Sequence, residues 1–169
     1  MDARYTLARI EIEKSNTWKA AQTAMKKIGL SGRIQRNQHG YLKINLASTK
    51  TRDLSLFSRL PVYSLNLWQT QVSNLEALKQ MPLRQLSLAY TSVSDLTPLK
   101  GRPLQSLTIA YSPIEDLTPL KGAPLIHLHL SSTKTDNLSP LKNMPLKTLH
   151  LDRTLITNLK PLAGLPIHE

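Results

Sequence analysis

Histidine and aspartate side chains near the C-terminal end are the residues of this sequence best suited to metal chemistry. His127 and His129 stand two positions apart, and His150 and Asp152 lie one interval of 21 residues beyond His129 and Ser131. If these residues lie on neighbouring β-strands, about 4.8 Å apart, imidazole and carboxylate groups could converge on a divalent ion such as zinc. A repeating sequence also aligns like residues by register alone. We therefore predict no metal site and no cofactor, and keep His127, His129 and His150 as candidate ligands.

Aromatic residues form the second group with a chemical role to consider. Trp68, Tyr90 and Tyr111 fall near the same place in three successive intervals. Exposed aromatic side chains with polar neighbours are typical of protein-recognition hot spots. The alternative is that the rings only lean against one another at the border of a sheet. The predicted protein-binding set is Trp68, Tyr90, Tyr111, His129, His150, Asp152 and Arg153.

Positive charge is the third feature, because the chain of 169 residues carries a formal net charge of +11. Lys79, Lys100, Lys121 and Lys142 recur at the 21-residue interval. Such a row could attract nucleic acid or another acidic ligand. The lysines are not interleaved with the aromatic residues, so a solvated face is the simpler interpretation.

Signatures of enzymes are absent from the sequence. There is no glycine-rich phosphate loop, no kinase motif and no nucleophile flanked by a base. The chain has no cysteine, which removes disulfides and thiolate metal sites, and it has no apolar run that could form a signal peptide or span a membrane. We therefore predict a cytoplasmic, non-catalytic protein without a membrane partner.

A strict repeat must position all of these residues. Proline recurs at 61, 82, 103, 124, 145 and 166, and the shared core is P-L-x-x-L-x-L-x-x-T. Gly40 stands one interval before the first proline, so the prediction is six repeats over 40–165. Residues 1–39 are predicted to be a cap, and 166–169 the start of an incomplete seventh repeat. One repeat buries too little apolar surface to fold alone, so the repeats must stack.

Each repeat divides into a strand and a return arc. Leu86-Ser87-Leu88 has the alternation of a strand, and Asp95 precedes a helical turn that contains Pro98 and ends at Gly101. The capping column predicted from this register is Asp53, Asn74, Asp95, Asp116, Asn137 and Asn158. A column of hydroxyls is predicted to bond the turn backbone from inside: Thr49, Thr70, Thr91, Ser112, Thr133 and Thr154.

These motifs resemble the leucine-rich repeat family over about three quarters of the chain. The resemblance implies an α/β fold: a right-handed solenoid with a parallel concave β-sheet, short convex 3-10 or turn segments and an N-terminal helical cap. The hydroxyl column departs from the family pattern, which has asparagine there. The motif T-x-V-x-D-L-x-P-L-K-G-x-P-L is similar to the repeats of large bacterial proteins that often carry a serine/threonine kinase domain. It is more distantly similar to the repeats of bacterial internalins. The implied role is a protein-interaction module within a larger protein, with a structural spacer as a further alternative.

The two ends of the array complete the prediction. A helix over about 15–29, with Trp18, Ala21, Met25 and Ile28 on one stripe, should pack on the first repeat and stop at Gly29. The segment 5–13 fits a helix or a strand, and we favour a helix. The C-terminal repeat should leave an apolar edge, which predicts either a larger protein or an edge-to-edge dimer.

Outward-facing residues of the concave strands should form the binding surface. They fall into four columns, one member per repeat. The columns are Lys43, Ser64, Gln85, Ser106, His127, Thr148; Asn45, Asn66, Ser87, Thr108, His129, His150; Ala47, Trp68, Ala89, Ala110, Ser131, Asp152; and Ser48, Gln69, Tyr90, Tyr111, Ser132, Arg153.

Overall fold

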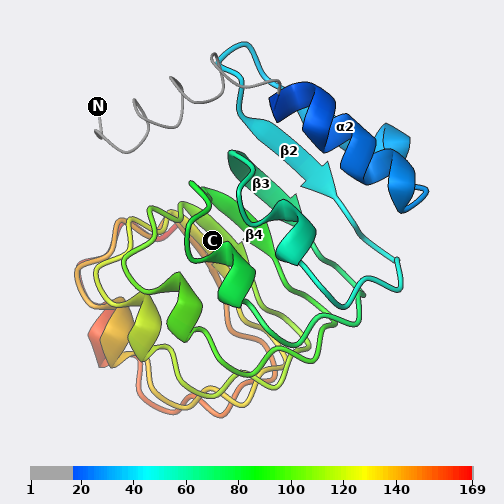
Figure 1. Ribbon diagram of the computed structural model, residues 1–169. Helices are drawn as coiled ribbons and strands as arrows, with labels where there is room; N and C mark the ends of the chain where they lie inside the picture. The colour runs from blue at the N-terminus through cyan, green and yellow to red at the C-terminus, as the bar shows by residue number, and fades with distance from the viewer. Residues whose placement is uncertain (1–16, 169) are drawn as a thin grey trace.

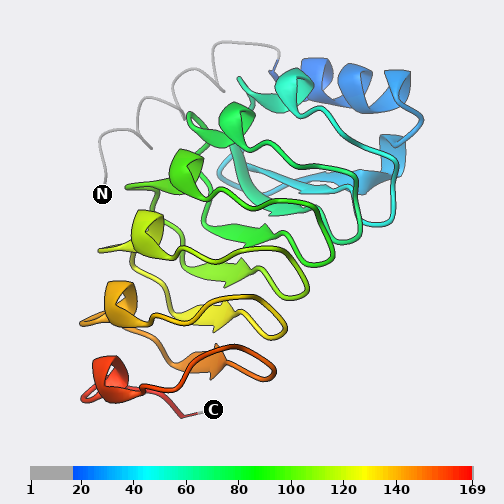
Figure 2. The same ribbon diagram turned by 90° about the horizontal axis from the view of Figure 1, so that it is seen from below.

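The computed structural model describes residues 17–168 as a stack of coils, with a sheet on one face and short helices on the other (Figures 1 and 2). The predicted segment 5–13 lies outside the described residues. The seven strands follow one another in chain order: β1 (Ile34–Arg36), β2 (Leu42–Asn45), β3 (Val62–Asn66), β4 (Gln85–Ser87), β5 (Ser106–Thr108), β6 (His127–His129) and β7 (Thr148–His150). From β2 to β7 the pairing is parallel, and Ser64 pairs with Gln85, which pairs with Ser106. The predicted parallel sheet is confirmed.

Short 3-10 helices occupy the return arcs, as predicted. They are η2 (Ser55–Phe57), η3 (Glu76–Leu78), η4 (Thr97–Leu99), η5 (Thr118–Leu120), η6 (Ser139–Leu141) and η7 (Lys160–Leu162). The predicted Asp or Asn column stands two residues before the first residue of each helix, one residue ahead of the leucine at the N-cap, and its side chains bond the first helical N–H. In η4 the N–H of Thr97 donates to Asp95 Oδ1 at 2.7 Å, and the other five members accept the equivalent bond at 2.7 to 3.0 Å. Each such bond satisfies an amide that the first helical turn leaves free.

The turn after the 3-10 helices from η4 to η7 has a left-handed residue at its third position, which is glycine in three of these coils and Asn143 in the other. Lys100 has φ −55° and ψ 127°, and Gly101 has φ 68°, which are the angles of a type II turn. The N–H of Arg102 closes this turn on the carbonyl of Leu99 at 3.0 Å. In the first two coils the position of Gly101 is held by Arg59 and Gln80, and neither has a positive φ. In these two coils the turn after the 3-10 helix therefore has no left-handed residue at this position and is not a type II turn.

The hydroxyl column bonds the strand-end turns from inside, which confirms its predicted role. Thr91 Oγ1 donates to the carbonyl of Leu88 at 2.7 Å, and Thr70 bonds Leu67 in the same way at 2.8 Å. Equivalent bonds exist in the other four coils. Both threonines are buried, so each hydroxyl satisfies a carbonyl that water does not reach.

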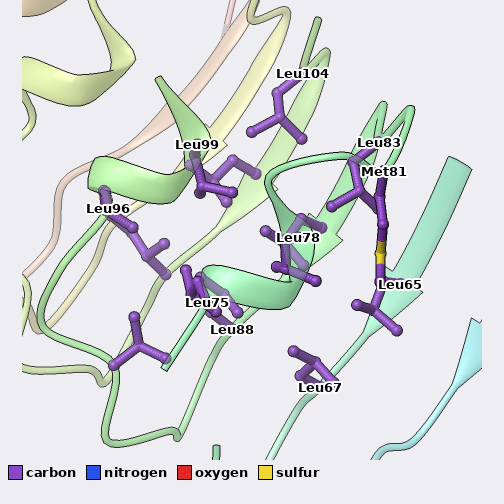
Figure 3. Close-up of a cluster of buried hydrophobic side chains, with 14 of the residues drawn as sticks. Leu65, Leu67, Leu75, Leu78, Met81, Leu83, Leu88, Leu96, Leu99 and Leu104 are labelled. Atoms are coloured by element: carbon purple, nitrogen blue, oxygen red, sulfur yellow. The ribbon is translucent and has the colours of Figure 1, made fainter. Parts of the chain in front are cut away.

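The core is one continuous apolar cluster between the sheet and the 3-10 helices. Figure 3 shows part of it, where leucines from strands, arcs and turns of successive coils lie side by side, with Met81 among them next to Leu83. Leu75 and Leu96 occupy the same place in two neighbouring coils, and each is 1% exposed. Because every coil contributes to the burial of the next, the stack is stable only as a unit.

The N-terminal end is closed by α2 (Thr17–Lys27) and by the hairpin-like pairing of β1 with β2, which is antiparallel. Ala21 and Met25 are fully buried and Trp18 packs against the core. The prediction was wrong for Ile28, which is 42% exposed because the helix has already ended. Gly29 has φ 71° and follows the helix end, as predicted, and the N–H of Leu30 bonds the carbonyl of Met25 at 2.8 Å.

The last complete coil is less covered than the others. Leu159 is 58% exposed, whereas Leu117 and Leu138 at the same place in the preceding coils are 1% exposed. Leu155 is 63% exposed. The equivalent residue of the third coil is the polar Ser92. None of the helices in the part of the chain that the structure describes has the length and apolar character needed to cross a bilayer.

Candidate functional site

Three aromatic side chains lie in contact along the end of the sheet, and we call Trp68, Tyr90 and Tyr111 the aromatic row. The rings of Tyr90 and Tyr111 are stacked, with centroids 4.4 Å apart and an interplanar angle of 10°. Trp68 meets Tyr90 edge-on at 5.9 Å and 77°. The three residues remain 39%, 48% and 43% exposed. The row therefore combines mutual packing with a large apolar surface open to solvent.

A left-handed backbone turn carries the two tyrosines. Tyr90 has φ 57° and Tyr111 has φ 56°, and the other members of their column share this conformation: Ser48, Gln69, Ser132 and Arg153. In the turn from Leu67 to Thr70 the N–H of Thr70 bonds the carbonyl of Leu67 at 3.2 Å, and Gln69 is the left-handed residue. This is a type II turn, in which that position normally favours glycine. Sequence analysis missed this feature, because no glycine marks it.

Amide side chains on the sheet hold the start of the aromatic row in place. Asn66 Oδ1 accepts the N–H of Trp68 at 3.0 Å, and Gln69 Oε1 accepts the hydroxyl of Ser48 at 3.2 Å from the neighbouring coil. The N–H of Tyr90 donates to the carbonyl of Ala110 at 3.1 Å, so the interstrand ladder continues past the strand end. The row is thus anchored by backbone bonds as well as by ring contacts.

Four residues that were predicted to be exposed on the sheet face are buried. Ala89, Ala110 and Ser131 of the third column are only 4%, 2% and 5% exposed, and Ser64 of the first is 7% exposed. The prediction was wrong for these four residues. Their short side chains project little beyond the backbone and lie below the level of larger neighbours. The surface available to a ligand is therefore made by the longer side chains beside these four residues.

The central part of this face carries no formal charge. We define the neutral patch as the four columns in the second, third and fourth coils, where all side chains are hydroxyl, amide, small apolar or aromatic. Its members are Ser64, Gln85, Ser106, Asn66, Ser87, Thr108, Trp68, Ala89, Ala110, Gln69, Tyr90 and Tyr111. A patch without charge contrasts with the formal net charge of +11 on the whole chain.

Beyond the neutral patch lies a histidine pair, His129 and His150, on adjacent strands β6 and β7. Their ring centroids are 4.7 Å apart and the rings are tilted by 49°. Burial lowers the pKa of His129, and the charge of His150 acts in the same direction, whereas Asp152 opposes it. Asp152 also accepts the hydroxyl of Ser131 at 3.2 Å. His129 therefore favours its neutral form near neutral pH.

The predicted metal candidates do not gather into a metal cage in the described part of the chain. His127 Nδ1 lies 3.1 Å from the Thr148 hydroxyl rather than facing the histidine pair. Between residues 17 and 168 no group of three or more His, Asp and Glu side chains is arranged to hold a metal ion. The structure brings His129, His150 and Asp152 to one region of the sheet, next to the aromatic row rather than within it.

Charge gathers on the other face. Lys100, Lys121 and Lys142 follow the C-terminal ends of η4, η5 and η6, and these helices stack directly on one another. Lys79 at the same place after η3 forms an ion pair with Glu76 at 2.6 Å.

One charge on the sheet face still influences the aromatic row, because the positive charge of Arg153 lowers the pKa of Tyr90. That effect is outweighed by desolvation and by Tyr111, which raise it.

Comparison with known proteins places this solenoid among solved structures. Internalin C2 of Listeria monocytogenes strain 4b F2365 superposes with a TM-score of 0.69 at 30% identity, covering 72% of this chain and 56% of that chain. A second internalin of the same strain, inlF, gives 0.69 at 31% identity, covering 75% of this chain and 38% of that one. The chain thus spans about half, or less, of the length of these proteins. No protein-family model and no curated protein sequence matches the chain. The period, the parallel sheet, the 3-10 arcs and these likenesses together show that the chain has the fold of a leucine-rich-repeat solenoid, similar to those of internalins.

Proposed function

We propose that the chain is a non-catalytic protein-interaction module that binds its partner through the concave sheet face, with the aromatic row at the centre of contact. The observation that carries this proposal is that Trp68, Tyr90 and Tyr111 are exposed together where three neighbouring inner strands end. Aromatic side chains that are rigid and only half covered are the residues that contribute most to binding energy in protein interfaces. His129, His150, Asp152 and Arg153 extend the proposed surface towards the C-terminal coil.

The arrangement of the row favours recognition over a purely structural role. Two tyrosines stand in a left-handed turn, a conformation that costs a residue with a β-carbon about 1–2 kcal/mol. The two aromatic pairs of the row contribute together about 1–3 kcal/mol, against about 2–4 kcal/mol for two left-handed tyrosines, so the ring contacts roughly offset that strain. A position that gains little stability from a large exposed aromatic residue is a candidate for functional selection.

Site-specific cross-linking tests which face binds. A photoreactive amino acid at Gln85 would stand on the exposed sheet face at the start of β4, in the same coil as Tyr90, and the same amino acid at Arg59 would stand on the opposite, helix face. We expect cross-linked partner protein from the Gln85 position and none from the Arg59 position. Cross-links from Arg59 alone would refute binding through the sheet.

The alternative partner, a nucleic acid, is tested by charge. The lysines after η4 and η5 stand on the helix face, away from the aromatic row. If nucleic acid is the partner, an oligonucleotide should bind with an affinity that falls steeply with salt, and Lys100→Glu with Lys121→Glu should abolish it. Under the present proposal this double substitution leaves partner binding unchanged.

Association of two copies through the last coil stays a separate prediction. Leu159 and Leu155 supply the apolar surface for it. Sedimentation velocity should show dimers that Leu159→Asp converts to monomers. A monomer over the whole accessible concentration range would show that the predicted dimer is wrong.

A further inference from the structure

The chemistry of the neutral patch indicates what kind of partner segment covers the aromatic row. We propose that this segment is an uncharged, proline-rich peptide in the polyproline II conformation, lying across the strands from the second coil to the fourth. The proposal rests on the proposed function, because it specifies what the same surface recognises.

Charge is the first argument. No side chain of the neutral patch is ionised, although the chain as a whole carries a formal charge of +11. A charged partner residue buried against this patch would lose its hydration without gaining an ionic partner within the patch, since Arg153, whose charge reaches Tyr90, lies two coils beyond it. An uncharged segment avoids that loss. The surface therefore discriminates against acidic ligands, which the positive charge of the rest of the molecule attracts.

Hydrogen-bonding capacity is the second argument. The patch presents donors from the indole of Trp68, the hydroxyls of Tyr90 and Tyr111, and the side-chain amide of Gln85, all of which are exposed residues. A polyproline II chain has no internal hydrogen bonds, and proline has a carbonyl acceptor but no N–H. Donors on the protein and unpaired carbonyls on the peptide are complementary.

Spacing is the third argument. Trp68 and Tyr111 stand two coils apart, with Tyr111 one residue further along its own coil, and two strand spacings across the sheet amount to about 9.6 Å. One turn of polyproline II, three residues long, advances about 9.3 Å, so successive turns place equivalent rings over Trp68 and Tyr111. An extended β-peptide repeats every 6.6–6.8 Å, roughly, and falls between coils. Of these two regular conformations, polyproline II is the one whose repeat length matches the distance between the coils of Trp68 and Tyr111.

Ring geometry is the fourth argument. Trp68 and Tyr90 meet at 77° and so form a corner, while the stacked Tyr90 and Tyr111 present parallel edges. A compact pyrrolidine ring, which has little internal freedom, can contact both walls of such a corner at once. Binding a chain that is already in its bound conformation also loses little conformational entropy, which suits a surface built mainly from three rings.

Titration calorimetry with a synthetic peptide tests the proposal. The probe is a chain of about ten prolines with both ends blocked, so that it is uncharged and held in polyproline II. The variants are Trp68→Ala and Tyr111→Ala, and the matched control is Leu56→Ala, which removes an apolar side chain of similar exposure, 46%, from the helix face. Thermal denaturation of each variant verifies that it is folded, and the second row variant keeps the test valid if one fails to fold.

The proposal predicts that the peptide binds the unmodified chain and that each row variant weakens binding by about tenfold or more. The control variant binds normally, and the dissociation constant changes less than about twofold between about 50 and 500 mM salt, because no charge is involved. Absence of binding at about millimolar peptide, or equal weakening in the Leu56→Ala control, would overturn the proposal.

Three comparison ligands and the cross-linking result separate this proposal from the proposed function. A glycine-serine peptide of equal length should not bind, because it lacks both the rings and the fixed conformation. If a neutral oligosaccharide or an acidic peptide binds in the place of the proline peptide, and Trp68→Ala abolishes it, the polyproline proposal is wrong while the sheet face remains the binding surface. If cross-links arise only from Arg59, the proposed function itself is wrong.

Discussion

Replacing Tyr90 by glycine should give a more stable protein than replacing it by alanine, the reverse of the usual order. Both substitutions remove the stacking on Tyr111 at 4.4 Å and the edge contact with Trp68 at 5.9 Å. They differ in the backbone. Alanine keeps a β-carbon in the left-handed conformation at φ 57°, whereas glycine adopts it without strain.

The size of the effect follows from these terms. Loss of the two ring contacts, at about 0.5–1.5 kcal/mol each, should lower the free energy of unfolding by about 1–3 kcal/mol in both variants. Glycine then recovers about 1–2 kcal/mol of left-handed strain and loses about 0.5–1 kcal/mol to its greater freedom in the unfolded chain. The glycine variant should therefore exceed the alanine variant in stability by about 0–1.5 kcal/mol, or roughly 0–6 °C in melting temperature for a protein of this size.

A strand position supplies the control. Thr108 lies in β5 with an ordinary extended backbone, so Thr108→Ala should be more stable than Thr108→Gly by about 0.5–1 kcal/mol. Urea denaturation followed by circular dichroism gives all four values. If alanine is the better replacement at Tyr90 as well as at Thr108, the backbone strain assigned to the aromatic row does not exist.

Three further predictions concern the scaffold. Gly101→Ala should lower the free energy of unfolding by about 1 kcal/mol, because a β-carbon has free space there but φ is 68°. Gly32 has equal space and no positive φ, so Gly32→Ala should be neutral or slightly stabilising in the same urea assay. Equal effects of the two substitutions would refute this explanation. Thr91→Val should cost about 1–3 kcal/mol, because the buried carbonyl of Leu88 loses the hydroxyl at 2.7 Å, and a value near zero would contradict the hydroxyl column. Hydrogen bonds from threonine lower the pKa of Asp95 and Asp116 in the folded state, so their stabilisation is present above the unfolded-state pKa and is lost as pH falls through the folded-state value. Replacing both by asparagine should flatten the fall of stability below about pH 4, and an unchanged pH profile would exclude these two carboxyls as its cause.

The sequence predicted the coil well because each part of it repeats. The hydroxyl of Thr91 and the carboxylate of Asp95 have the same neighbours in every repeat, so register alone identifies their bonds to Leu88 and Thr97. Alternation of apolar residues likewise predicted which strand side chains enter the core, because successive side chains of a strand point to opposite faces.

The candidate site was harder to predict, because it depends on how turns aim their side chains. Nothing in the residue types of Tyr90 and Tyr111 indicates a left-handed backbone, since glycine or asparagine usually marks that conformation. Alternation placed Ala89 and Ala110 on the outward face, but it carries no information on the height of neighbouring side chains, and the two are buried. The stacking of the rings depends on both features.

The affinity of a cross-linked partner for two single variants tests the central claim most directly. Once the protein captured from the Gln85 position is purified, its dissociation constant should be measured for Trp68→Ala and for Leu56→Ala, which remove apolar side chains of similar exposure from opposite faces. The proposal of a binding surface at the aromatic row predicts weakening by about tenfold or more for Trp68→Ala and no change for Leu56→Ala. Equal affinities for the two variants, with both still folded, would contradict it.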